Sequence, residues 1–198
     1  MKIIFTGTSE FAVPSLEHLI ASRHDIAAVI TQTDKPKGRG RELQLSPVKQ
    51  VALAHSFPVL QPEKISTPDS VEQIKSFSDI DLMVVVAYGQ KISKELLDWP
   101  ERGVINVHGS ILPKYRGAAP IQHAIIAGEE YTGVTTMLMD EGLDTGDILL
   151  QESIQIHPEE NAGELSARLA LLGAGLLMKT LEDIEEGNIN LVPQDNEL

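Results

Sequence analysis

The sequence has no cysteine among its 198 residues. Disulfides, zinc sites built on cysteine thiolates and catalysis by a thiol nucleophile are therefore excluded. Long hydrophobic runs are also missing, because no apolar stretch approaches the roughly 20 residues that a membrane-spanning helix needs. Met1 runs directly into the first predicted strand, so we expect no signal sequence. We therefore expect a protein of the cytoplasm that has no membrane partner.

Basic residues are scarce, with 16 Lys and Arg against 29 Asp and Glu, which gives a net charge of −13. The acidic excess is concentrated between Asp140 and Leu198, which carry 14 acids and 2 bases. The segment from Asp34 to Lys49 instead has five bases and two acids, a net charge of +3. Because the local field governs contact with a polyanion, the negative total does not exclude a nucleic-acid partner.

The G-x-G-x-x-G fingerprint of dinucleotide-binding folds is another absence, since Gly7 has no partner glycines. What is present is an alternation of apolar strands and amphipathic helices. The predicted strands span 3–6, 26–31, 58–60, 81–87 and 104–107, and the predicted helices end near residues 22, 56, 77, 99 and 127. The alternation predicts an α/β fold with a doubly wound, mostly parallel sheet.

The alternation changes after residue 130. Two predicted strands, 132–139 and 148–156, are joined by a connection too short for a parallel crossover, so we expect an antiparallel pair. A long amphipathic helix follows over 162–186, with leucines at helical spacing that indicate core packing. The predicted fold therefore ends in an antiparallel strand pair and a long final helix.

Two polar residues, Asn106 and His108, interrupt the apolar strand at 104–107. Side chains two apart on a strand share a face, about 6.5–7 Å apart along the backbone. Ligands bind beyond the carboxyl ends of strands in open α/β sheets. A histidine with a purely structural hydrogen bond is the alternative. The asparagine on the same face and the loop that follows, with its Pro and Gly residues, favour a functional site.

Asp144 is the third candidate, in a glycine-rich turn between the last two predicted strands. A calcium site is disfavoured because the turn lacks the EF-hand spacing, and we expect no metal ion. An aspartate that only shapes the turn is a further alternative. The two glycines favour a ligand contact, because they let backbone approach a ligand closely.

If Asn106, His108 and Asp144 converge, they suit transfer of an acyl-level carbon. No G-x-S-x-G elbow is present, so a covalent acyl-enzyme is disfavoured. The Asn106 amide can donate to a developing oxyanion, which typically contributes about 2.7–4 kcal/mol. A histidine beside a carboxylate can move protons near neutral pH. An α-amino group, with an ordinary pKa of about 8, would be a suitable acceptor.

The stretch from 32 to 46 is predicted to be a loop, longer than a connector requires, basic and hinged by Gly38 and Gly40. Two interpretations of this stretch remain open, a binding loop and a disordered loop. Ser46 and Pro47 then predict the cap and first residue of a helix.

These motifs together resemble one family, the 10-formyltetrahydrofolate-dependent formyltransferases, which are Rossmann-like. Residues 106–121 resemble its active-site segment, 140–147 its aspartate loop, and 87–90 the strand end of its folate pocket. Residues 31–41, with 46–49, resemble the loop of the member that formylates initiator methionyl-tRNA. The resemblance covers essentially the whole chain.

The resemblance implies that Asn106 stabilises the formyl oxyanion and His108 handles protons, while Asp144 orients His108 or a water that relays protons to folate N10. It also implies contacts with 10-formyltetrahydrofolate from two sets of residues. They are Ser110, Ile111, Leu112 and Pro113 for the folate, and Tyr88, Gly89, Gln90, Asp140, Glu141 and Gly142 around the pterin.

The resemblance further implies that Lys35, Lys37, Arg39 and Arg41 contact phosphates of the tRNA acceptor stem, which would not read sequence. We expect a monomer in which residues 1–190 form the catalytic domain. Residues 191–198 would begin a linker to a C-terminal tRNA-binding domain that this chain does not contain. Weak tRNA affinity is therefore expected.

Three alternatives remain open. A related enzyme could formylate a small amine, such as glycinamide ribonucleotide or an amino sugar, although the basic stretch favours tRNA. A domain that binds folate or RNA without turnover is the second. The third is hydrolysis of the formyl donor by the same three side chains.

Overall fold

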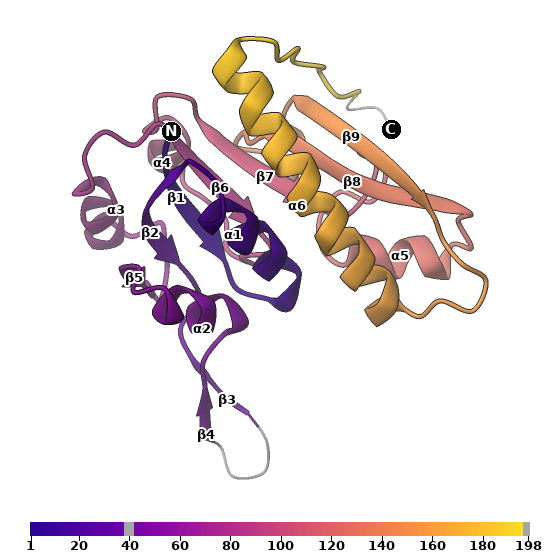
Figure 1. The fold of residues 1–198 in the computed structure, drawn as a ribbon, viewed down its shortest axis with the longest axis horizontal. Coiled ribbons are helices and arrows are strands. Elements are labelled where there is room, and N and C mark those ends of the chain that lie inside the picture. The colour runs from indigo at the N-terminus through magenta and orange to yellow at the C-terminus, as the bar shows by residue number, and fades with distance from the viewer. Residues whose placement is uncertain (38–41, 196–198) are drawn as a thin grey trace. The chain divides into compact units, whose positions relative to one another are not determined.

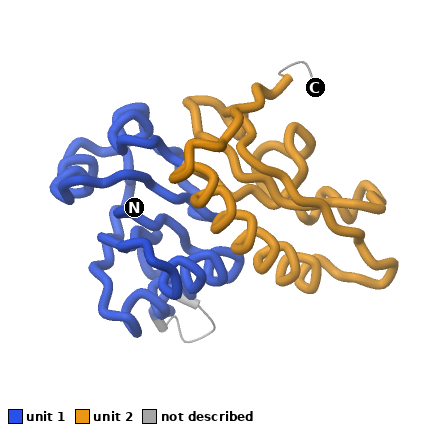
Figure 2. Tube along the Cα trace, turned by 45° about the horizontal axis from the view of Figure 1, so that its top comes forward, with its two compact units in different colours: residues 1–104 blue, residues 105–198 orange. Residues whose placement is uncertain are grey.

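The computed structural model describes residues 1–37 and 42–195. The chain divides into two compact units, Met1–Val104 and Ile105–Leu198 (Figure 2). Each unit is described below by itself.

The first unit contains a parallel sheet in the strand order β5-β2-β1-β6. Its strands are β1 (Lys2–Gly7), β2 (Asp25–Ile30), β5 (Val59–Leu60) and β6 (Leu82–Val86). Every residue of β6 is buried, as its uninterrupted apolar run predicts for a strand covered on both faces. The parallel sheet expected for this half of the chain is confirmed.

The helices of the first unit end before the predicted residues, and the helix after Ser46 begins at its predicted cap. They are α1 (Val13–Ile20), which follows a short 3₁₀ turn at Glu10–Ala12, then α2 (Pro47–Ala54), α3 (Pro68–Lys75) and α4 (Lys94–Leu97). The Ser46 hydroxyl accepts from the Lys49 backbone N–H, and a proline fills the first helical position, so the predicted start of α2 is confirmed.

The basic stretch predicted to be a loop contains two short strands, β3 (Lys35–Lys37) and β4 (Glu42–Gln44). They pair antiparallel, with Lys35 opposite Gln44, and extend away from the rest of the first unit (Figure 1). The prediction was wrong here because neither strand has the run of β-branched or aromatic residues that marks a strand in a sequence.

One ion pair fixes the base of these strands. The Lys49 ammonium lies 2.5 Å from the Asp34 carboxylate, whose other oxygen accepts from Gln61 at 2.9 Å. The hydrogen bond from Lys49 holds the pKa of the Asp34 carboxyl below its ordinary value. Lys49, counted in the sequence as part of the basic stretch, is therefore engaged within the first unit.

The second unit contains the antiparallel sheet β7-β8-β9. Strand β7 (Val104–His108) leads into it, and β8 (Tyr131–Leu138) and β9 (Ile148–Gln155) form the antiparallel pair that the sequence predicts. The helix α5 (Pro120–Ile126) lies between β7 and β8 in the chain. The fold class is therefore the predicted one, a Rossmann-like α/β fold with a mostly parallel sheet.

The final helix, α6 (Ala162–Glu186), has the predicted bounds and lies along the sheet of the second unit (Figure 1). Asn161 and Glu164 form a capping box at its start, and Gly187 ends it with a φ of 72°. A Cβ at Gly173 would lie 2.9 Å from Val107 of β7, so this glycine lets the helix approach the strand closely. Among the described residues, none of the helices is both long and apolar enough to cross a bilayer.

Candidate active site

Strand β7 points two polar side chains away from α6. Val107 faces Gly173 of α6, so its neighbours in the chain, Asn106 and His108, lie on the opposite face. Both are nearly buried, with exposed fractions of 9% and 6%. Polar groups at this depth need partners, because an unpaired buried polar group is costly.

The Asp144 turn provides those partners. The Asn106 Nδ2 donates to Asp144 Oδ1 at 3.3 Å, and the His108 Nδ1 lies 3.6 Å from Asp144 Oδ2. The three side chains suggested by the sequence therefore meet within the second unit, although 38 positions separate Asn106 from Asp144 in the chain.

The turn holds Asp144 in an uncommon backbone conformation, with a φ of 53°. The Asp140 carboxylate accepts from the Gly142 N–H at 3.0 Å and from the Thr145 hydroxyl, which closes the turn on itself. A Cβ at Gly146 would lie 1.8 Å from the Leu138 carbonyl oxygen, so no other residue fits there without a backbone shift. Two of the residues assigned to the pterin, Asp140 and Gly142, therefore shape the turn.

The loop after β7 contributes two backbone groups that sequence reasoning missed. The Gly117 N–H donates to Asp144 Oδ2 at 2.8 Å, and the Tyr115 carbonyl oxygen lies 3.0 Å from His108 Nε2. Both residues have positive φ angles, 89° for Gly117 and 58° for Tyr115. The Pro and Gly residues of this loop were the available signal, but they do not indicate which backbone group faces the site.

The Tyr115 carbonyl determines which nitrogen of His108 carries the fixed hydrogen. A carbonyl can only accept, so a hydrogen bond at this position requires the hydrogen on Nε2. Nδ1, which faces the Asp144 carboxylate, is then the nitrogen that can exchange a proton. The Asp144 carboxylate has both oxygens engaged, Oδ1 accepting from the Asn106 amide and Oδ2 from the Gly117 N–H.

Tyr115 is itself held by α5 and the turn after it. Its hydroxyl donates to Glu129 Oε1 at 2.7 Å, and its ring stacks on His123 with centroids 6.3 Å apart. Lys114 donates to the same Glu129 oxygen, and this hydrogen bond lowers the pKa of the Glu129 carboxyl. The carbonyl that faces His108 therefore belongs to an anchored residue.

Some groups of the segment predicted to contact folate are instead hydrogen-bonded within the loop itself or to β8. Ser110 is fully buried and donates to the Lys114 carbonyl at 2.6 Å, and Leu112 is 2% exposed. Thr135 of β8 donates to the Ser110 carbonyl and accepts from the Leu112 N–H. Ile111 and Pro113 keep partly exposed side chains.

The first unit carries the residues assigned to the pterin at the end of β6, where side chains also face inward. Tyr88 is 2% exposed, its hydroxyl has no hydrogen-bond partner among the described residues, and burial raises its pKa to about 12. The Gln90 carboxamide accepts from the Ile65 N–H at 2.9 Å and donates to the Glu63 carbonyl at 3.2 Å. Gly89 remains exposed.

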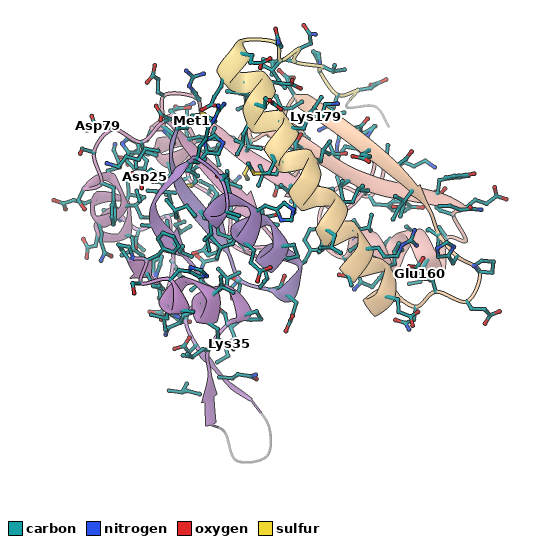
Figure 3. All side chains as sticks on the ribbon, viewed as in Figure 1. Met1, Asp25, Lys35, Asp79, Glu160 and Lys179 are labelled. Carbon is teal, nitrogen blue, oxygen red and sulfur yellow. The ribbon has the colours of Figure 1, made fainter. Side chains whose placement is uncertain are left out.

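The basic residues assigned to tRNA are only partly described. Lys35 is exposed at the start of β3, with its ammonium 3.0 Å from Gln32 Oε1 (Figure 3). Lys37 ends the same strand, whereas Arg39 and Arg41 lie outside the described residues.

Among residues 1–37 and 42–195, no three His, Asp or Glu side chains are grouped so that they could hold a metal ion.

Comparison with known proteins identifies the family. Residues 1–181 match the model of a family described as formyl transferase. The chain belongs to the formyl transferase family. Its curated relatives in this family include two named methionyl-tRNA formyltransferase. The one from Ruminiclostridium cellulolyticum is 55% identical over 198 residues, which cover 100% of this chain and 63% of that protein. The one from Alkaliphilus metalliredigens is 56% identical over 189 residues, 96% of this chain and 60% of the relative. The chain thus spans somewhat less than two thirds of their length.

Solved structures of formyltransferases share the fold. A phosphoribosylglycinamide formyltransferase from Bacillus halodurans superposes with a TM-score of 0.77 at 26% identity, over 93% of this chain and 95% of that one. An N-formyltransferase from Helicobacter canadensis, in complex with folinic acid and dTDP-3-aminofucose, gives a TM-score of 0.75 at 22% identity. That match covers 99% of this chain and 68% of the other.

Proposed function

We propose that this chain carries the chemistry of an enzyme that transfers the formyl group of 10-formyltetrahydrofolate to the α-amino group of initiator methionyl-tRNA. Membership of the formyl transferase family and relatives of that name at 55% and 56% identity support the proposal. The observation that carries it is the meeting of Asn106, His108 and Asp144, a donor, a proton carrier and a carboxylate, around one point.

The formyl carbon passes through a tetrahedral intermediate when the amine attacks it. The Asn106 amide has two N–H donors, and only one of them is needed for the bond to Asp144 Oδ1. The second can donate to the developing oxyanion, where one such donor contributes about 2.7–4 kcal/mol. Asp144 thereby also fixes the orientation in which Asn106 presents that donor.

One proton must move for the transfer to balance. The amine loses a proton as the new carbon–nitrogen bond forms, and folate N10 gains one as its bond to the formyl carbon breaks. His108 Nδ1 takes and returns the proton, directly or through a water, while the Tyr115 carbonyl keeps Nε2 fixed. Asp144, 3.6 Å from Nδ1, orients the ring during the transfer.

The tRNA belongs to the proposal as the acceptor. Lys35 and Lys37 belong to β3, and Arg39 and Arg41 lie between β3 and β4 in the sequence. Contacts of these bases with tRNA phosphates would be salt-dependent. We keep residues 1–190 as the catalytic domain and 191–198 as the start of a linker to a tRNA-binding part, which the greater length of the relatives supports. The proposal places a monomeric enzyme in the cytoplasm, with no metal and no membrane partner.

The test is transfer of labelled formyl from 10-formyltetrahydrofolate to methionyl-tRNA, with glycinamide ribonucleotide as a competing acceptor. Replacing His108 by Ala should lower the transfer rate by about two to four orders of magnitude, as expected for loss of a general acid–base. His157→Ala, an exposed histidine in the turn before α6, is the matched control and should keep the wild-type rate.

Each other outcome overturns a defined part of the proposal. Label on glycinamide ribonucleotide alone would show that the acceptor is wrong. Formate released without an acceptor would indicate hydrolysis. Folate binding without transfer to either acceptor would identify a binding domain.

A further inference from the structure

The segment after α6 returns to the candidate active site. Val192 exchanges two backbone hydrogen bonds of 2.9 Å with Ile148, at the start of β9. This bridge directs the following residues, Pro193, Gln194 and Asp195, toward the turn that carries Asp144.

Gln194 connects two loops through a single carboxamide. Its Nε2 donates to the carbonyl oxygens of Asp144 at 3.0 Å and of Gly146 at 2.7 Å. Its Oε1 accepts from the Arg116 guanidinium, from Nε at 3.0 Å and from Nη2 at 2.8 Å. Arg116 also donates to the Asp195 carbonyl at 3.0 Å. Both N–H donors and both lone pairs of the carboxamide are therefore used.

These contacts lie one residue away from those that orient the reacting groups. Arg116 stands between Tyr115, whose carbonyl faces His108, and Gly117, whose N–H donates to the Asp144 carboxylate. On the other side, Gln194 binds the carbonyl of Asp144 itself. Asp144 has a positive φ, which a non-glycine residue keeps only where its surroundings hold it.

We propose that Gln194 is a positioning residue for formyl transfer. It holds the Asp144 turn against the Tyr115–Gly117 loop, so that the carboxylate keeps its contacts with Asn106, His108 and the Gly117 N–H. The chemistry of the side chain supports this role. Glutamate has no donor for the two carbonyls, lysine has no acceptor for Arg116, and asparagine is one methylene shorter.

The expected effect on the rate of formyl transfer rests on the proposed function. The experiment therefore includes a second readout that is independent of the proposed function. Backbone amide exchange at Gly117, followed by NMR, reports whether its N–H still donates to Asp144. The variants are Gln194→Ala, which removes both halves of the contact, and Gln194→Glu, which keeps the acceptor for Arg116 and loses both donors. Asn190→Ala, four residues earlier and exposed, is the matched control.

For both Gln194 variants we expect Gly117 exchange to become at least about tenfold faster. We expect kcat for formyl transfer to fall about 10- to 100-fold, with KM for the folate little changed, as for residues that orient a catalytic group through one intermediate. Protection of the α6 amides, such as Leu169, should stay at its wild-type level, which shows that the fold is intact. Asn190→Ala should change neither readout.

The inference is overturned if Gln194→Ala and Gln194→Glu leave Gly117 exchange and kcat unchanged. A lower kcat with unchanged Gly117 exchange also overturns it, because Gln194 would then act in another way. If Gln194→Ala loses α6 protection, the same two readouts are taken from Gln194→Glu and Arg116→Lys. Lysine at position 116 keeps the positive charge but cannot make both hydrogen bonds to Gln194 Oε1. If the unaltered protein transfers no formyl group, the proposed function fails while the exchange readout still tests the positioning.

Discussion

We propose two tasks for Asn106 that a single amide can perform together. One N–H binds Asp144 Oδ1 at 3.3 Å, and the other is available to an oxyanion. Its neighbours Ile105 and Val107 are apolar and buried, so the strand itself keeps the amide in place. The residue was visible in the sequence because it interrupts an apolar strand two positions before His108.

Asn106→Ala removes that donor and leaves a small apolar group at the strand end. We expect kcat for formyl transfer to fall about 10²- to 10³-fold, the loss typical of one oxyanion donor. Asn188→Ala, in the turn after α6 and exposed, is the control. A variant at position 106 that transfers formyl at the wild-type rate would show that the oxyanion is stabilised elsewhere.

Elements could be predicted from the sequence where they carry strong local signals. Helix α6 was predicted at its observed bounds from leucines at helical spacing, and in the structure a capping box begins it and a glycine ends it. The strands β3 and β4 were missed because their pairing, not their composition, makes them strands. Four helices ended two residues before their predicted ends, as expected for termini whose signals are weak.

The contact of α6 with β7 depends on one glycine of the helix. Gly173→Ala would place a Cβ 2.9 Å from Val107 Cγ1, and we expect it to destabilise the protein by about 1–3 kcal/mol through overpacking. Gly175→Ala is the matched control, because nothing lies within 4 Å of its Cβ position. It should be stabilising by about 0.5–1 kcal/mol, since alanine is favoured over glycine within a helix.

Urea unfolding of the two variants measures the difference directly. Equal free energies of unfolding for Gly173→Ala and Gly175→Ala would mean that the helix does not press against the strand at residue 173.

The ion pair at the base of the β3–β4 strands should make the free energy of unfolding depend on pH. The Asp34 pKa is lowered in the folded state, so the contribution of its ion pair with Lys49 is present above the ordinary Asp pKa. The contribution is lost as pH falls through the lower, folded-state value. Lys49→Met should cost about 1 kcal/mol at neutral pH and nothing once Asp34 is protonated.

Unfolding curves of the unaltered protein and of Lys49→Met between pH 7 and pH 2 test this directly. The two free energies of unfolding should converge in acid. A constant gap across the whole range would assign the effect of Lys49 to packing instead of to the ion pair.

For the molecule as a whole, net charge is a poor guide to partners. The acidic excess lies in the chain after residue 139, while the β3–β4 strands belong to the basic stretch near residue 40. The three candidate residues could be predicted from the sequence, but the contacts that surround them could not. The reach of Gln194 depends on a contact 50 positions away in the chain, and the inward direction of Tyr88 depends on how the strand end packs. The Tyr115 carbonyl is only seven positions from His108, but its direction depends on how the loop between them folds.

The central claim is that a strand end and a turn 38 positions apart act as one chemical unit. The most direct measurement is the single-turnover rate of formyl transfer to methionyl-tRNA for His108→Ala, Asp144→Ala and the double variant. Because His108 and Asp144 are proposed to act through one contact, at 3.6 Å, the double variant should lie within about threefold of the slower single variant. A double variant slowed by the product of the two single effects would contradict the account, as would an Asp144→Ala protein that transfers formyl at the unaltered rate.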